Sequence, residues 1–215
     1  MNVTLIQATP NAIETIAQIA SICYDSDPKN PMGLVKHLYR NGHHSVFEHI
    51  YFTFKVEGIS RACSHQLVRH RHCSFTQRSQ RYCSEDGFGY VTPETVDAGR
   101  FANDMEDIGD WYEGYQKDGV PNEDARYILP NACETSLYVS CNLRELIHMA
   151  NERKCFRAQW EIRAVANEML KLCLQAAPNI FRYAGPSCVA KGICPEGKMT
   201  CGRIKEMRER YTVKK

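Results

Sequence analysis

The stretch that says most about this chain is residues 67–82, which read LVRHRHCSFTQRSQRY. It holds four arginines and two histidines but no carboxylate. Positive side chains without a counter-charge repel one another, so a fold tolerates them best where an anionic ligand completes the site. Guanidinium groups are planar and forked, which suits paired contacts with phosphate oxygens. The stretch therefore predicts a site for a phosphorylated small molecule.

A basic run also occurs on solvated surfaces and in nucleic-acid-binding proteins. The whole chain has 27 lysines and arginines against 25 acidic residues, so its net charge is only +2. Domains that bind nucleic acids are usually far more basic, and we therefore predict no nucleic-acid partner. The main alternative is a non-catalytic nucleotide- or RNA-binding module that uses Phe75, Tyr82 and Tyr90 as stacking groups.

Length and composition fit one domain. The 215 residues, 43% of them hydrophobic, suffice for one substantial core. No apolar run approaches the roughly 18 to 20 residues that span a bilayer, and the first residues do not resemble an export signal. The eleven cysteines are an odd number and include no C-x-x-C pair, so we expect reduced thiols. These features predict a cytoplasmic protein that does not associate with membranes.

Residue patterns predict an α+β fold, a single domain in which helices flank a central, mostly antiparallel sheet. Helices are predicted over residues 11–24, 31–40, 59–70, 94–117, 122–128 and 159–176, and another opens at Asn142. Strands are predicted over residues 50–56, halted at Gly58, and over 135–141, while residues 73–82 are predicted to be a loop entering a short strand. Rossmann and P-loop glycine patterns do not occur, so neither nucleotide site is predicted.

Three cysteines, Cys188, Cys194 and Cys201, lie in a tail rich in glycine, proline and lysine that begins near residue 185. Three thiols can bind zinc when a fourth ligand comes from elsewhere in the chain. Their spacings of six and seven residues are, however, wider than those of usual ligand pairs. From the sequence alone we therefore predict no metal.

The spacing of the basic stretch, in which Arg69-His70-Arg71 is followed after seven residues by Ser79 and then by Arg81, resembles the signature of the flavin-dependent thymidylate synthases. Blocks on both sides match this family in order and approximate separation. They are GHHSVFEH (42–49), IYFTF (50–54), RYILP (126–130), NLR (142–144) and AQWEIR (158–163). The resemblance covers about residues 40 to 165, which is most of the chain.

The resemblance implies an enzyme that methylates dUMP to dTMP. Methylenetetrahydrofolate would supply the carbon, and FAD, reduced by NADPH, would carry the hydride, so that the cofactor supplies the redox chemistry. It also implies a homotetramer with active sites shared between chains, built from one such domain over residues 1–215.

The resemblance further implies roles for individual residues. Arg153, nine residues after Arg144, would hold the uracil ring in its N3-deprotonated form and is the predicted catalytic residue. The residues implied in FAD binding are His43, Ser45, Arg69, His70, Arg71, Gln77, Asn142, Arg144 and His148. Those implied around dUMP are Gln66, Leu67, Arg69, Gln77, Arg78, Ser79, Gln80, Arg81, Arg126 and Arg153, with Ser79 and Arg81 near the phosphate. Gln77 and His148 stand where many members carry Glu and some carry Asn, but both still form hydrogen bonds.

Two alternative interpretations stay open at this point. Taken without the resemblance, Arg153 reads as a solvated charge at a helix end. A conventional thymidylate synthase would instead need an activated cysteine, and Cys73 and Cys83 lie on either side of the segment from Ser74 to Tyr82. Only the flavin-dependent interpretation predicts a yellow protein.

Overall fold

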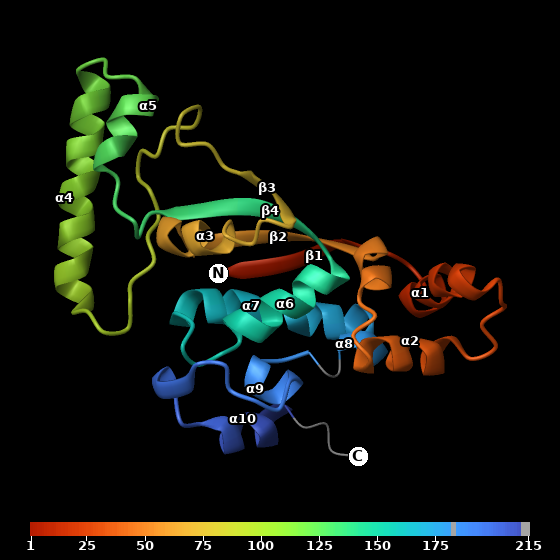
Figure 1. Ribbon diagram of the computed structural model, residues 1–215. Coiled ribbons are helices and arrows are strands. Elements are labelled where there is room, and N and C mark those ends of the chain that lie inside the picture. The colour runs from red at the N-terminus through yellow and green to blue at the C-terminus, as the bar shows by residue number, and fades with distance from the viewer. Residues whose placement is uncertain (182–183, 212–215) are drawn as a thin grey trace.

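A four-stranded antiparallel sheet lies at the centre of the molecule. The computed structural model describes residues 1–181 and 184–211, and the strands over these residues pair in the order β1-β2-β4-β3 (Figure 1). The strands are β1 (Asn2–Ala8), β2 (Tyr51–Ser60), β3 (Cys73–Gln77) and β4 (Glu134–Asn142). All three pairings are antiparallel, which confirms the predicted α+β class with a central antiparallel sheet.

Helices surround this sheet. The α-helices are α1 (Ala12–Ser21), α2 (Pro31–Arg40), α3 (Arg61–Leu67), α4 (Ala98–Lys117), α5 (Asn122–Ala125), α6 (Leu143–Arg153), α7 (Trp160–Ala176), α8 (Pro178–Phe181), α9 (Ser187–Ala190) and α10 (Ile204–Tyr211). Short 3-10 helices are η1 (Ile22–Tyr24), η2 (Ser45–His49), η3 (Arg126–Ile128) and η4 (Gly197–Met199). Figure 1 shows α6 and α7 beneath the sheet, α1 and α2 at one end, and α9 and α10 below α6. Among the described residues, no helix is both long and apolar enough to cross a bilayer.

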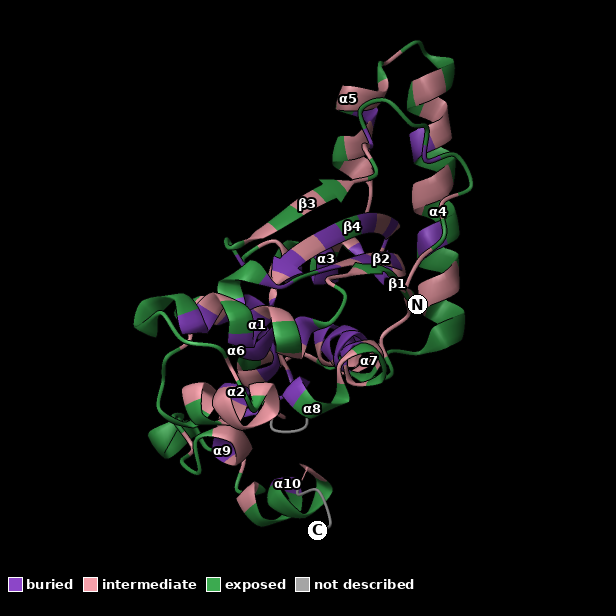
Figure 2. Cartoon of the chain, turned by 90° about the vertical axis from the view of Figure 1, so that its right-hand side faces the viewer, coloured by how far each residue is buried: buried purple, intermediate pink, exposed green. Residues whose placement is uncertain are grey.

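The core lies between one face of the sheet and α6 and α7. Along β2, Phe52, Phe54 and Val56 alternate with more exposed residues, as a strand with one buried face requires. The ring of Phe52 packs edge-on against Phe181 of α8, with centroids 5.3 Å apart. Figure 2 shows buried residues on β2, β4, α6 and α7, so the sheet and α6 share one core beside the cavity described below.

Several predicted elements have the expected bounds because their end signals are local. Helix α2 begins at Pro31 and ends at Arg40, as predicted, because Asn30 caps it and Asn41-Gly42 stops it. The side chain of Asn142 accepts a hydrogen bond from the backbone N–H of Glu145 at 2.9 Å and so opens α6. Arg153, at the last position of α6, is thereby fixed relative to the end of β4.

Three predicted boundaries were wrong. Strand β2 runs through Gly58 to Ser60, because Gly58 adopts a φ of 64° and the register shift between Val56 and Ile59 absorbs it as a bulge. Ser60 then caps α3, which is therefore shorter than predicted and ends at Leu67. Residues 73–77 form a strand that leads into a loop, the reverse of the predicted order, because they pair with β4.

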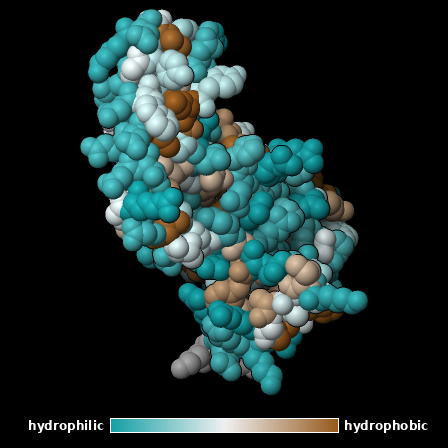
Figure 3. Space-filling model, turned by 90° about the vertical axis from the view of Figure 1, so that its left-hand side faces the viewer, coloured by the Kyte–Doolittle hydropathy of each residue, from teal (hydrophilic) through white to brown (hydrophobic). Residues whose placement is uncertain are grey.

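Two further elements differ from prediction. Strand β1, which was not predicted, adds to the edge of the sheet through pairing with β2. Helix α4 begins at Ala98 rather than 94, because the side chain of Asp97 accepts from the N–H of Arg100 at 2.7 Å. Helices α4 and α5 project from the end of the sheet opposite α1, and apolar side chains gather in patches over this arm in Figure 3.

Candidate active site

The predicted site residues fall into two groups at opposite ends of β3. Arg69, His70 and Arg71 precede the strand, whereas Arg78 and Arg81 follow it. A five-residue strand extends over roughly 13 to 17 Å. One chain therefore presents two partial sites, and each can be described by itself.

A cavity of about 830 Å³ contains the first group. Its walls come from η2, the turn between α3 and β3, and α6. Seven predicted residues line it: Arg69, His70, Arg71, Asn142, Arg144, His148 and Arg153. Eight further residues of its lining were not singled out from the sequence: His44, Glu48, His72, Glu145, Ile147, Asn151, Glu152 and Lys191. Within the described chain, His43 and Ser45 flank His44 in sequence but are not part of this lining.

The cavity carries a positive balance of charge. Its five cations are Arg69, Arg71, Arg144, Arg153 and Lys191, against the three carboxylates Glu48, Glu145 and Glu152. Arg144 forms an ion pair with Glu48 at the exposed rim. The donors that remain suit a ligand bearing phosphate groups.

A buried histidine orients the predicted catalytic arginine. Nδ1 of His70 lies 3.1 Å from Oε1 of Glu145, and Nε of Arg153 donates to Nε2 of His70 at 2.9 Å. His70 is only 4% exposed and Glu145 only 6%, so water does not replace either contact. Glu145, His70 and Arg153 therefore form one continuous chain of hydrogen bonds from inside α6 to the cavity.

The direction of these bonds fixes the state of the imidazole. Because Arg153 only donates, Nε2 of His70 must accept, and the proton of the neutral ring lies on Nδ1, facing Glu145. Burial, and then the charge of Arg153, lower the pKa of His70 below its usual value, while Glu145 and Glu152 oppose this shift. His70 is therefore neutral at physiological pH and available to hold Arg153.

Glu152 and His148 lie next to this arrangement. Nε2 of His148 is 3.4 Å from Glu152, and the His148 ring packs edge-on against His70 at 6.0 Å. Nitrogen and oxygen atoms of His70, His148 and Glu152 come within 4.8 Å of one another, a spacing that metal ligands also show. Both ring nitrogens of His70 are already engaged, with Glu145 and Arg153, so in this structure hydrogen bonds hold the cluster together.

The second group belongs to the loop after β3. Arg78 forms an ion pair with the buried carboxylate of Glu85, whose backbone N–H donates to the hydroxyl of Tyr112 in α4 at 3.1 Å. The Nε of Arg81 donates to Glu123 at 2.5 Å. The loop that carries the predicted phosphate contacts is thus fastened to the α4–α5 arm.

Other members of this group share the same support. Arg126 donates from Nε to the carbonyl oxygen of Glu123 at 3.0 Å, which places it beside Arg81. The Oγ atom of Ser79 accepts from the backbone N–H of Arg81 at 3.2 Å. Gln80 is buried, and its amide lies 3.6 Å from Sγ of Cys133. Arg81 and Arg126 thus both contact Glu123, and Ser79 contacts the backbone of Arg81.

Three further predicted residues belong to neither group. The amide of Gln77 donates to Oγ of Ser64 and to Oγ1 of Thr135, at 3.0 and 3.1 Å, so it braces β3 against α3 and β4. Leu67 is fully buried and Gln66 half-buried at the end of α3. Their contacts with a ligand stay a prediction.

A buried carboxylate holds the start of α3 in place. Glu161, at the first turn of α7, accepts from the backbone N–H of Ser60 at 2.7 Å and from its hydroxyl at 2.6 Å. Ser60 in turn accepts from the N–H of Cys63 as the cap of α3. This contact, over 101 residues of sequence, links the AQWEIR block to the start of the helix that precedes the basic stretch.

Comparison with known proteins places the chain among close relatives. The family model described as "Thymidylate synthase complementing protein" matches residues 4–179. The "Flavin-dependent thymidylate synthase" of Geobacter sulfurreducens is 46% identical over 228 aligned positions, covering 98% of each chain. The protein of the same name from Clostridium tetani is 40% identical, and the alignment covers 98% of this chain and 97% of the relative. The one from Pyrococcus abyssi is also 40% identical, and the alignment covers 98% of this chain and 96% of the relative.

Proposed function

The chain belongs to the flavin-dependent thymidylate synthases, and we propose that it converts dUMP to dTMP with methylenetetrahydrofolate as the carbon donor and FAD, reduced by NADPH, as the hydride carrier. The observation that carries this proposal is the cavity in which Glu145 and His70 orient Arg153 among four other cations. Reduced FAD supplies the hydride when it is bound. All other tasks of the reaction fall to side chains.

The hydrogen-bond donors that line the cavity suit the phosphate groups of FAD. Arg69 and Arg71 offer forked, permanently charged groups, which match the oxygens of a pyrophosphate better than ammonium groups do. Asn142 opens α6, and Arg144 lies in its first turn at the exposed rim. We assign cofactor binding to these four residues and to His148 on the same wall.

Arg153 acts on the uracil ring in this proposal. Its Nε–H is held by His70, so the plane of the guanidinium is set before any ligand arrives. Its two Nη groups are the paired donors that a ring carbonyl oxygen and a deprotonated N3 require. A fixed positive group at this position stabilises negative charge that develops on the ring without giving up a proton.

The separation of the two groups supports a site shared between chains. Ser79 and Arg81 follow β3, whereas His70, which holds Arg153, precedes it, so the length of the strand, roughly 13 to 17 Å, separates the two ends. We propose that dUMP bound by Arg153 of one chain receives its phosphate contacts from the loop of another, within a homotetramer. Light scattering tests the assembly: a stable monomer that makes dTMP would contradict a shared site.

Burial excludes two of the thiols as the nucleophile of a conventional mechanism, which leaves Cys73 and Cys83 as its candidates. Burial raises the pKa of Cys63, near Arg153, to about 12 and that of Cys133 to about 11, so neither forms the thiolate that a nucleophile needs. All eleven cysteines lie within the described residues and are free thiols. Free thiols and a reaction that consumes NADPH support the predicted cytoplasmic location.

Purified protein tests the proposed function. It should be yellow, release FAD on denaturation, and form dTMP only when dUMP, methylenetetrahydrofolate and NADPH are all present. A non-catalytic nucleotide-binding module would bind dUMP without product. Absence of dTMP from FAD-loaded protein supplied with all substrates would overturn the proposal.

A further inference from the structure

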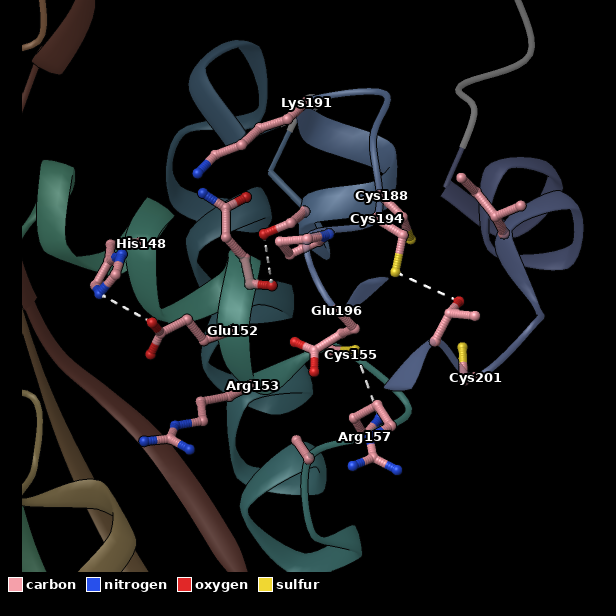
Figure 4. Close-up of a pocket in the computed structure, with 16 residues that line it drawn as sticks. His148, Glu152, Arg153, Cys155, Arg157, Cys188, Lys191, Cys194, Glu196 and Cys201 are labelled. Atoms are coloured by element: carbon pink, nitrogen blue, oxygen red, sulfur yellow. Dashed lines mark hydrogen bonds and ion pairs between the residues drawn. The ribbon is translucent and has the colours of Figure 1, made fainter. Parts of the chain in front are cut away.

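Four cysteines line a second cavity, on the other side of Arg153 from the basic stretch. This cavity measures about 590 Å³ and lies between the tail and the segment that joins α6 to α7. Cys188, Cys194 and Cys201 of the tail enter it together with Cys155, which lies 33 positions before Cys188. Figure 4 shows the four thiols around the same opening.

The four thiols approach from separate elements. Cys188 lies in α9 and is buried, while Cys194 and Cys201 lie in loops on either side of η4. Sγ of Cys194 donates to Oγ1 of Thr200 at 3.5 Å, and Sγ of Cys155 accepts from the N–H of Arg157 at 3.5 Å.

Hydrophobic packing holds α10, where Met207 is 2% exposed, but not the loop that carries Cys194 and Cys201. Among the described residues, Ala184 is the last to join the main hydrophobic core. Ile193 and Met199, the large apolar residues beside Cys194 and Cys201, are 73% and 57% exposed. A loop that turns its apolar side chains outward and its thiols inward has the arrangement of a segment folded around a metal centre.

We propose that Cys155, Cys188, Cys194 and Cys201 bind a [4Fe–4S] cluster. In a Cys₄ cluster site each thiolate binds a different iron, so the ligands surround a volume rather than a single point. The sequence alone suggested no metal because the tail offers only three thiols at wide spacing. The fold supplies the fourth thiol at the end of α6.

The spacing of the sulfur atoms favours a cluster over one zinc ion. Tetrahedral zinc with Zn–S bonds of about 2.3 Å holds its sulfur atoms about 3.8 Å apart. In the described part of the chain, three potential ligand atoms come within 4.8 Å of one another only at His70, His148 and Glu152. No three of the thiols are that close, although all four line one cavity.

Neighbouring charges suit such a centre. Four thiolates leave a cluster with net negative charge, and the cations Lys191, Arg157 and Arg153 outnumber the carboxylates Glu152 and Glu196 in the lining of the same cavity. The centre would fasten the tail to the end of α6, because Cys155 lies two residues after Arg153. It would thereby support the last turn of the helix that presents the arginine to the other cavity.

Metal analysis of the full-length protein, purified without oxygen and without substrates, tests the proposal independently of thymidylate synthesis. We expect about four irons and four acid-labile sulfides per chain, and a paramagnetic signal after dithionite reduction that is distinct from a flavin radical. Cys194→Ser and Cys188→Ser should each lower the iron content at least tenfold. Cys23→Ser, at an exposed cysteine outside the cavity, should leave it unchanged.

Three results would overturn the proposal. One is about one zinc per chain without sulfide, and another is protein that takes up neither iron nor sulfide during anoxic reconstitution. The third is equal iron content in Cys194→Ser, Cys188→Ser and Cys23→Ser. The iron and sulfide content of the unmodified chain decides the matter even if the tail variants fail to fold.

Discussion

Replacement of His70 by phenylalanine keeps a buried ring but removes both of its hydrogen bonds. One bond joins it to Glu145 at 3.1 Å, and the other comes from Arg153 at 2.9 Å. Hydrogen bonds to charged groups contribute about 1.5 to 3 kcal/mol each, and loss of a partner leaves the buried carboxylate of Glu145 unpaired. We expect His70→Phe to lose about 3 to 5 kcal/mol of unfolding free energy, which lowers the melting temperature by roughly 10 °C.

The same substitution should reduce turnover, because Arg153 loses the bond that sets its plane. By analogy with loss of an oxyanion-hole donor, dTMP formation should fall roughly 10²-fold. Circular dichroism on heating and chromatographic measurement of dTMP provide the two readouts. His65→Phe, at an exposed histidine of α3, is the matched control, and His70→Gln should recover part of both losses because an amide both donates and accepts. Unchanged stability and turnover in His70→Phe would refute the role given to this residue.

Three further outcomes are expected. Arg81→Ala should weaken dUMP binding roughly 10- to 100-fold in calorimetry, because a charge-assisted bond to the phosphate contributes about 1.5 to 3 kcal/mol. Uridine, which has no phosphate, should bind as before. Equal losses of affinity for both ligands would place Arg81 away from the phosphate. The pKa of His70 in the folded chain lies below its usual value of about 6.5, so the unfolded chain binds a proton at this imidazole more readily than the folded chain does. The free energy of unfolding should therefore fall as the pH drops below about 6.5, and turnover should decrease at still lower pH. In His70→Gln, the free energy of unfolding and the turnover should no longer show this decrease at acid pH. If the decrease persists in the variant, another titratable group causes it. Cys73→Ser should keep most of its dTMP formation, whereas complete loss with FAD still bound would favour a cysteine nucleophile.

Local signals made much of the fold predictable. Some residues mark the end of a helix through contacts within a few positions, as Pro31, Asn142 and Pro178 do. The helix ends that these residues mark lie within one or two positions of the predicted ones. Long-range pairing was not predictable in this way. Strand β2 continues past Gly58 because β4 is available as a partner, and β1 forms because it can pair with β2.

The residues of the candidate site also divide into those with a signal in the sequence and those that only long-range packing brings into place. Arg153 was predictable only through its spacing from the Asn-x-Arg block, since an arginine at a helix end is usually a solvated charge. Glu145 carried no signal, because a glutamate in the first turn of a helix is ordinarily an exposed partner of the helix dipole. Its burial against His70 becomes visible only when α6 and the turn after α3 come together across 75 residues of sequence.

The activity of Arg153→Lys tests the central claim most directly. Lysine keeps the positive charge but loses the planar pair of donors, so it cannot hold a ring carbonyl and a deprotonated N3 together. If Arg153 activates the ring, the FAD-loaded variant should retain its flavin and its fold but form dTMP roughly 10²-fold more slowly. A charge that only interacts with the helix dipole contributes about 0.3 to 1 kcal/mol and would be preserved by lysine. Turnover equal to that of the unmodified protein would therefore contradict the assignment of ring activation to Arg153.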